Sequence, residues 1–213
     1  DLDLVKGNPQ TRRKFLDLEI GQISKEYLYN LQNYKKILKQ RNDLLKTMQK
    51  QKESDMLLLD IITDQLIDYL IKIVEQRKQF ILEINSIANQ VYKVVSNSDS
   101  DLKIEYLPNT YKNIKKEFVA KYQYDIITGT TNLGVHRDDI EFILRDSYVK
   151  THASQGELRT TVLAVKLALV EFIKKHKGEY PVLLLDDVLS ELDLNRQNNL
   201  IKYINDKIQT FIT

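Results

Sequence analysis

Two neighbouring acids, Asp186 and Asp187, follow an apolar run at residues 182–185. Four consecutive apolar residues predict a buried strand, and open α/β sheets bind ligands at the carboxyl ends of their strands. A carboxylate held there beside a phosphate group could position Mg²⁺, which favours one or two carboxylates together with phosphate oxygens. A second acid next to it could orient or deprotonate an attacking water. The alternative is a strand that enters a loop whose acids are only solvated, and the pattern alone leaves both interpretations open.

A second polar group consists of Ser154, Gln155, Gly156 and Glu157. This group stands at the start of residues 156–176, which we expect to form a helix. A serine followed by glutamate three residues later is a capping box, which satisfies two backbone N–H groups and needs no ligand. The same geometry can bind an anion, because Gly156 permits close approach and the helix start presents free N–H groups to a phosphate oxygen. Taken alone, this group favours the cap.

A third polar group follows the two acids and includes Ser190 and Asp193. By itself, Asp193 is explained as the cap of a helix expected over 195–207. Each of the three groups is a weak signal alone. Their order along the chain is the informative feature, with the helix start first, the strand and its acids second, and this turn third.

The segments around these residues alternate between helix and strand. This alternation predicts a parallel sheet covered by helices. The expected elements are a helix over 156–176, a strand over 182–186, a helix over 195–207 and a strand over 209–212. Before them, residues 140–144 alternate between apolar and polar side chains and predict a strand, followed by a turn at 146–147 and a returning strand over 148–150.

The first half of the chain predicts two long amphipathic helices. Apolar residues recur every three or four positions from 16 to 48, after a start at Pro9, and again from 59 to 94. A polar run at 49–55 separates the two stripes, so we expect an antiparallel helical hairpin whose arms bury their stripes against each other. Gly21 weakens the first arm and predicts a local kink.

Shorter elements are expected between the two halves. The sequence predicts a polar loop over 96–101, a strand over 103–107, a helix over 111–124 and a β-rich stretch that opens at 128–131. Composition changes near residue 126, so we expect two domains. Residues 1–126 would form an all-α lobe built on the long antiparallel hairpin, and residues 127–213 would form an α/β lobe, a partial sheet with covering helices.

The charges are nearly balanced, with 32 Lys and Arg against 30 Asp and Glu in 213 residues. A basic surface for nucleic acid must therefore be local. Charge runs on helices are usually solvated faces, so DNA contact and simple solvation both stay open. The candidate clusters are Arg12-Arg13-Lys14, then Lys35, Lys36, Lys39, Arg41 and Lys46 on the first arm, and finally Lys112, Lys115 and Lys116.

Cysteine is absent, which excludes a disulfide scaffold and cysteine-ligated zinc and fits a reducing compartment. No stretch approaches the roughly 18 apolar residues that a membrane-spanning helix needs. The first residues contain neither an initiator Met nor a signal-peptide pattern. We therefore expect a cytoplasmic piece of a longer protein, with no membrane partner.

Taken together, the three polar groups resemble the carboxyl-terminal half of an ABC-type ATPase head. Residues 153–157 resemble its signature motif, 182–187 its Walker B strand and 190–193 its D-loop. More narrowly, the chain is similar to the RecF family of bacterial recombination and replication-repair proteins, which is related to SMC heads. The runs that carry this resemblance are Gly-Val-His-Arg-Asp-Asp at 134–139, Ser-Gln-Gly-Glu-Leu-Arg-Thr-Thr at 154–161, the stretch 178–193, and residues 4–17.

The resemblance implies a fold, a cofactor and residue roles. In that family two heads close face to face over two ATP molecules, so the α/β lobe is expected to be ABC-ATPase-like and the protein an ATP-dependent homodimer. At the matching positions, Asp186 would hold Mg²⁺ and Asp187 would be the catalytic acid that polarises the attacking water. Nucleotide held by the partner subunit would be contacted by Ser154, Gln155, Gly156, Glu157, Ser190 and Asp193.

The resemblance also implies partners. RecF proteins resemble one another in binding DNA near single-strand/double-strand junctions and in working with RecR and RecO to help load RecA. The function implied is recombinational repair of DNA gaps and stalled replication forks, with a part in the SOS response. For DNA contact we select Arg12, Arg13 and Lys14.

The sequence departs from the family pattern at several positions. Val135 stands where RecF proteins usually have Pro, and Gln155 and Glu157 stand where transporters have Gly and Gln. Asp187 replaces the Glu of most ABC ATPases, and its shorter side chain predicts slow hydrolysis.

No Gly-x-x-x-x-Gly-Lys-[Ser/Thr] loop occurs in the sequence. Without that loop the β- and γ-phosphates lack their cradle, so we expect the 213 residues alone neither to bind ATP tightly nor to hydrolyse it. Two alternatives remain open, another SMC-like or transporter ATPase head and a non-enzymatic helical interaction module. A phosphate-binding loop in upstream sequence would favour the enzyme.

Overall fold

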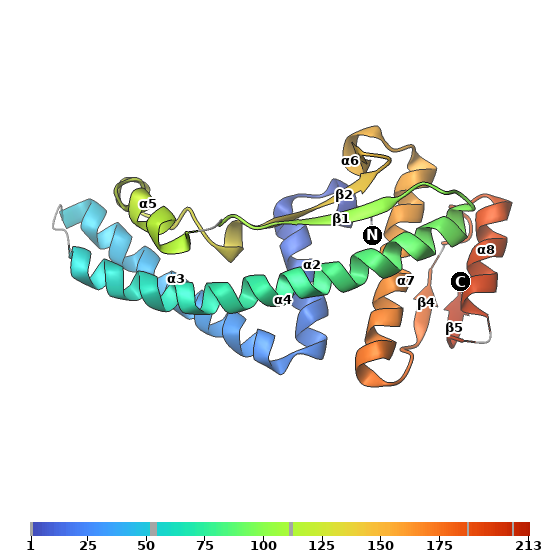
Figure 1. Cartoon of the computed structure of the whole chain (residues 1–213), viewed down its shortest axis with the longest axis horizontal. Helices are drawn as coiled ribbons and strands as arrows, with labels where there is room; N and C mark the ends of the chain where they lie inside the picture. Colours follow the sequence, from blue (N-terminus) through green and yellow to red (C-terminus); the bar gives the residue numbers. More distant parts are fainter. Residues whose placement is uncertain (1, 52–54, 111–112, 187, 206) are drawn as a thin grey trace. The chain divides into compact units, whose positions relative to one another are not determined.

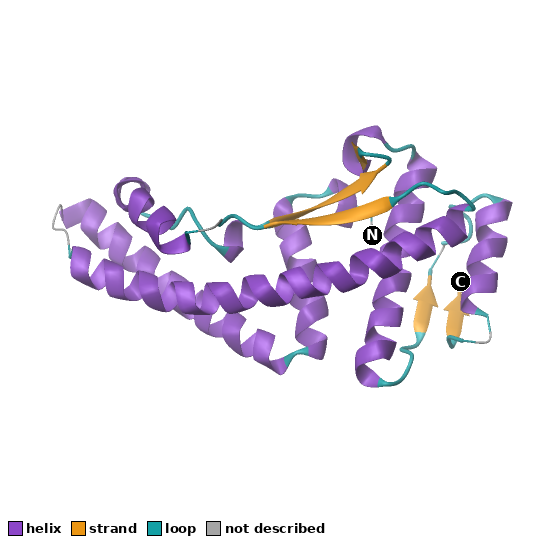
Figure 2. Ribbon diagram, in the orientation of Figure 1, coloured by secondary structure: helices purple, strands orange, loops and turns teal. Residues whose placement is uncertain are grey.

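The computed structural model describes residues 2–51, 55–110, 113–186, 188–205 and 207–213 (Figure 1). The helices are α1 (Asp3–Lys6), α2 (Pro9–Ile23), α3 (Lys25–Gln51), α4 (Met56–Ser96), α5 (Ile114–Thr128), the short 3₁₀ turn η1 (Val135–Arg137), α6 (Val149–His152), α7 (Gln155–Lys177) and α8 (Leu194–Ile204). The strands are β1 (Leu102–Leu107), β2 (Asp139–Leu144), β3 (Ser147–Tyr148), β4 (Leu183–Leu185) and β5 (Thr210–Ile212). The fold is mostly helical with small sheets (Figure 2).

Helices α3 and α4 form the predicted antiparallel hairpin. Tyr27 and Tyr29 near the start of α3 contact Arg77 and Tyr69, while Arg41 further along α3 contacts Thr63. Residues later in α3 therefore contact residues earlier in α4, which is the pairing of antiparallel helices. The buried side chains of both helices follow the predicted three-and-four spacing over most of their length, whereas Val94, which was expected in the stripe, is half exposed.

The first arm is interrupted at Ser24 and not at Gly21, where the kink was predicted. The Ser24 hydroxyl accepts a hydrogen bond from the backbone N–H of Tyr27 at 3.0 Å, so Ser24 acts as the cap of a new helix. Gly21 lies inside α2, and a Cβ there would lie 2.7 Å from Leu28 Cδ2. The glycine therefore makes room for Leu28 where the chain turns, and the cap residue sets the break.

The sheets are small in the described part of the chain. One has the strand order β1-β2-β3, with β2 and β3 antiparallel and Ile143 opposite Tyr148. The other pairs β4 with β5 in parallel, with Leu184 opposite Phe211. The prediction of a return strand over 148–150 is wrong at its end. The observed strand β3 stops at Tyr148, and the chain enters α6 at Val149.

Strand β4 was predicted to be fully buried, and that prediction is wrong at Leu184. Leu185 is buried, but Leu184 is 72% exposed. Neighbouring residues of a strand point to opposite faces of the sheet. In β4, Leu185 therefore lies on the covered face and Leu184 on the face that is open to solvent.

Contacts divide the chain into two compact units. The mixed unit comprises Asp1–Phe15, Gln79–Tyr106 and Ile140–Thr213, and it contains the sheets and helix α7. The helical unit comprises Leu16–Lys78 and Leu107–Asp139, and it contains α3, α5 and the first half of α4. The predicted domains, 1–126 and 127–213, are single continuous stretches of chain, whereas each compact unit is made of several stretches. The domain division at residue 126 remains a prediction.

Candidate functional site

The start of α7 is the predicted capping box. Glu157 N–H donates to Ser154 Oγ at 3.3 Å, and Ser154 N–H donates to Glu157 Oε2 at 2.8 Å. Partial burial alone raises the pKa of Glu157, but hydrogen bonds from Ser154 and Arg145 lower it overall. Ser154 and Gln155 are exposed. The carboxylate of Glu157 is thus engaged within its own chain, whereas the side chains of Ser154 and Gln155 face solvent.

An arginine from α8 covers Gly156 in the first turn of α7. A Cβ at this position would lie 2.5 Å from Arg196 Nη1. The same guanidinium nitrogen lies 3.4 Å from Asp193 Oδ2, an ion pair one turn apart at the start of α8. Glycine therefore permits the Arg196 guanidinium to pack directly on the backbone of the helix entrance.

Asp186 lies at the carboxyl end of β4, as predicted. It is exposed, and its Oδ1 accepts a hydrogen bond from the Thr213 hydroxyl at 2.7 Å. A cavity of about 530 Å³ opens beside it, lined by α7, by β4 and by Glu191 and Leu192 of the following turn. The neighbouring candidate Asp187 lies outside the described residues.

The turn at residues 188–193 carries the remaining two candidates. Ser190 is exposed, and Asp193 caps α8 by accepting the Arg196 N–H at 3.1 Å. The backbone of the turn is held by Gln197 of α8, whose Nε2 donates to Leu189 O at 2.7 Å and to Leu192 O at 2.9 Å. Sequence reasoning found the cap but missed this second role of α8.

Arg159 of α7 also contacts this turn and was missed. Its Nη1 donates to Glu191 O at 3.2 Å, and its Nη2 lies 3.3 Å from Glu191 Oε1. Nothing in the local sequence identifies such a pair, because 32 residues separate its members. The structure thus brings the helix entrance and the turn together through arginines that no motif marks.

The predicted DNA contacts lie in different environments. Arg12 is 5% exposed and donates from Nη1 to Gly7 O at 2.6 Å, so its guanidinium stabilises the turn between α1 and α2. Arg13 is half-buried and Lys14 is exposed. Of these three side chains, Lys14 is the most accessible to a polyanion.

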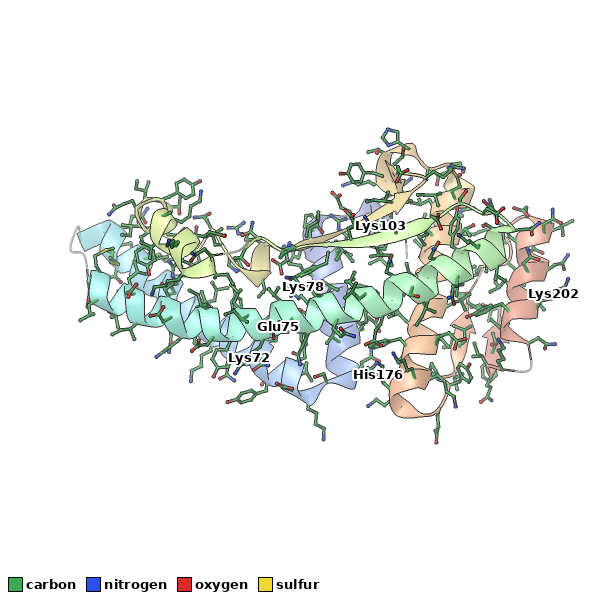
Figure 3. All side chains as sticks on the ribbon, in the orientation of Figure 1. Lys72, Glu75, Lys78, Lys103, His176 and Lys202 are labelled. Atoms are coloured by element: carbon green, nitrogen blue, oxygen red, sulfur yellow. The ribbon has the colours of Figure 1, made fainter. Side chains whose placement is uncertain are left out.

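The basic residues of the helical unit do not all face solvent. Arg41, named as a DNA candidate, is fully buried and pairs with Asp125, so it is not available to DNA. Lys115 forms ion pairs with Asp60 and Asp64, and Lys112 lies outside the described residues. On α4, Lys72, Glu75 and Lys78 alternate in sign along the helix (Figure 3), which mixes the exposed charge there.

Two buried arginine networks organise the helical unit and were not found from sequence. Arg41 Nη1 lies 2.8 Å from Asp125 Oδ2, and Arg41 Cζ lies 5.4 and 5.7 Å from the ring centroids of Phe118 and Tyr122. The available sequence signal was the position of Arg41, which stands in the apolar stripe where the helical spacing predicts an apolar residue. The buried pair ties α3 to α5.

The second network uses the Gly-Val-His-Arg-Asp-Asp run. Arg77 of α4 donates to Val135 O at 2.9 Å and to Asp138 at 2.8 Å, and it also pairs with Asp17. The Tyr34 hydroxyl lies 2.8 Å from His136 Nδ1. This run is therefore bound into the helical unit by polar contacts.

Two general features bear on possible ligands. Within the described ranges, no group of three or more His, Asp or Glu side chains is placed to hold a metal ion. None of the helices in the part of the chain that the structure describes is long and apolar enough to cross a membrane.

Comparisons with solved structures define the class of protein. The chain superposes on the "Smc head domain with an extended coiled coil" from Pyrococcus furiosus with a TM-score of 0.54 at 14% identity, covering 99% of this chain and 52% of that one, which shows a shared fold. It superposes on "the recombination mediator protein RecF-ATP in RecFOR pathway" with a TM-score of 0.88 at 30% identity, covering 100% of this chain and 59% of that one. The fold is thus that of RecF and SMC heads.

Sequence comparison identifies the family. The chain is 45% identical over 224 residues to the DNA replication and repair protein RecF of Geobacillus thermodenitrificans and 43% identical to that of Bacillus velezensis, covering 100% of this chain and 60% of each relative. No protein-family model matches. The chain is a homologue of the DNA replication and repair protein RecF, and it spans about 60% of the length of these relatives.

Proposed function

We propose that the full-length protein is a DNA-binding ATPase of the RecF type, which dimerises on ATP and acts in the repair of DNA gaps and stalled replication forks. The observation that carries the proposal is the end-to-end match of the chain to RecF, both in sequence and in fold. The solved relative is described as a recombination mediator bound to ATP, which supports ATP as the cofactor here.

The geometry of the mixed unit supports the assigned roles. The exposed Ser154 stands at a helix entrance whose N–H groups and dipole favour a phosphate oxygen, so we propose that it contacts ATP held by a partner subunit. Its neighbours Gln155 and Gly156 belong to the same entrance, while Glu157 orients it through the capping box. The exposed Ser190 and Asp193 are proposed to cross the dimer interface.

Asp186 fits a magnesium-binding role. Mg²⁺ is held in such sites by one or two carboxylates and by phosphate oxygens and water, so a single exposed carboxylate at the end of a parallel strand matches the chemistry. The ion would offset negative charge on the phosphates. Asp187, beside it in the sequence, is proposed as the acid that orients the attacking water, with slow hydrolysis as the consequence of its short side chain.

DNA, RecR and RecO are the partners we propose, with RecA acting downstream of them, in the cytoplasm. Support for the protein partners comes from the pathway named for the solved relative. For DNA, the exposed Lys14 is the contact best supported by the described surface.

Dimerisation of the full-length protein tests the proposal. Size-exclusion chromatography with light scattering, in Mg²⁺ with either ATP or ADP, is expected to give a dimer with ATP alone. Ser154→Arg should abolish that dimer, because the bulky side chain would occupy the space where the helix entrance contacts the γ-phosphate. Asn198→Arg adds the same side chain at an exposed position of α8 and should leave the dimer intact. A Ser154→Arg protein that still dimerises like the wild type would exclude the role of the helix entrance.

A further inference from the structure

Side chains of α7 and α8 bind the backbone of the turn at residues 188–193. Three of its backbone carbonyl groups accept hydrogen bonds from these helices: Leu189 O and Leu192 O from Gln197, and Glu191 O from Arg159. Hydrogen bonds to several carbonyls of one turn restrict the path of its backbone and satisfy polar groups that a turn leaves without a secondary-structure partner. The turn therefore moves with the helices that hold it.

Arg159 makes the link that leads to the helix entrance. It lies three residues after Gly156, so its backbone belongs to the first turns of α7. Its two terminal nitrogens contact different groups of one residue, the carbonyl and the carboxylate of Glu191, at 3.2 and 3.3 Å. The planar guanidinium suits such forked contacts, because its donors are held in a fixed geometry, whereas the lysine ammonium is a compact charge on a flexible stem.

The Nε of Arg159 is buried and has no hydrogen-bond partner among the described residues. A buried unsatisfied N–H is unfavourable for folding. The orientation of the guanidinium is thus set by its contact with Glu191, and not by satisfaction of all its donors.

A second link joins the other end of the turn to the same entrance. Arg196 forms an ion pair with Asp193 at 3.4 Å and packs against Gly156. The helix entrance and the turn are therefore bridged twice, by Arg159 through Glu191 and by Arg196 through Asp193.

We propose that Arg159 is a positioning residue that couples the entrance of α7 to the turn at 188–193. The inference rests on the proposed function, in which the entrance contacts the partner's ATP and the turn crosses the interface. With the link in place, phosphate contact at Ser154 and interface contact by Ser190 and Asp193 form and break together. Two sites biased by one shared element are coupled energetically in this way.

The test uses the full-length protein with the variant Arg159→Gln. The variant should weaken ATP-dependent dimerisation about tenfold, within the range of ordinary coupling free energies, while the monomer binds ATP as before. Amide hydrogen exchange separates coupling from general destabilisation. ATP should still protect residues 154–158 in the variant, but protection of residues 188–193 should be reduced, because only the link through Arg196 remains.

A milder variant keeps the test decisive if Arg159→Gln folds poorly. Glu191→Gln removes the carboxylate but retains the backbone acceptor, so dimerisation should weaken less, by about threefold. The charge-reversed pair Arg159→Glu with Glu191→Arg should recover part of the loss. Lys202→Gln, which removes an exposed cation from α8 (Figure 3), should change nothing.

The outcomes distinguish failure of the coupling through Arg159 from failure of the proposed function. Wild-type protein that dimerises with ATP, beside variants of Arg159 and Glu191 that dimerise equally well and keep protection at 188–193, refutes the coupling and leaves the proposed function standing. Wild-type protein that never dimerises with ATP overturns the proposed function and the coupling together.

Discussion

Replacing Arg41 by methionine should destabilise the helical unit by about 3–5 kcal/mol, because it leaves a buried carboxylate without its cation. Arg41 and Asp125 are both 0% exposed, and their charged atoms lie 2.8 Å apart. The substitution also removes the contacts of the guanidinium with the rings of Phe118 and Tyr122. Methionine is long and flexible enough to fill most of the vacated volume, so the loss is chiefly electrostatic.

Urea titration monitored by amide hydrogen exchange in α3 and α5 measures this loss locally. A local probe is needed because a chain with two compact units need not unfold in a single step. With an m value of about 2 kcal/mol/M, a loss of about 4 kcal/mol lowers the urea midpoint of these helices by about 2 M.

Two further variants decide whether the buried pair is the cause. Lys35→Met, on the same helix, removes a cation that is 62% exposed and 3.5 Å from Asp17, and it should cost less than about 1 kcal/mol. Arg41→Met combined with Asp125→Asn should be less destabilising than Arg41→Met alone, because no uncompensated charge remains. The reasoning fails if Arg41→Met costs no more than Lys35→Met.

Three further outcomes are expected. Partial burial raises the pKa of Glu83, but hydrogen bonds from Lys175, Gln79 and His176 outweigh it and lower the pKa to about 2. The ionised carboxylate therefore stabilises the fold above the usual pKa of 4.5, and this stability is lost as the pH falls toward 2. Glu83→Gln should make the urea midpoint depend less on pH across this acid range. Gly134→Ala should lower the free energy of unfolding by about 1–3 kcal/mol or more in thermal or urea denaturation, because Gly134 has φ +124° and an added Cβ would overlap the Tyr34 hydroxyl. Lys14→Gln in the full-length protein should weaken binding to junction DNA of any sequence and reduce the slope of log affinity against log salt by about one; an unchanged slope would remove Lys14 from the interface.

Local patterns in the sequence predicted much of the secondary structure. The apolar stripes predicted the hairpin of α3 and α4, since a helix with one apolar face must bury it. Ser154 and Glu157 predicted the start of α7, because a capping box is decided by residues three positions apart. Features of this kind depend on neighbours along the chain and can be seen without a fold.

Predictions failed where the outcome depended on distant residues. Arg41 looked like one more surface cation until Asp125, which lies 84 residues later, was placed against it. Leu184 belonged to an apolar run that predicted full burial, but it lies on the open face of the β4–β5 sheet. Periodicity shows which residues share a face of an element, and it does not show what covers that face.

The sequence by itself therefore determined the amphipathic hairpin, the capped helix and the order of the polar groups that resemble an ATPase head. Only the tertiary structure decided that Arg77 binds the run at 135–138, that Arg159 reaches Glu191, and that Arg196 packs on Gly156. The physical reason is the range of the interactions. Helix periodicity and caps act over three or four residues, whereas a buried ion pair or a forked arginine forms only after packing brings distant side chains within about 3 Å.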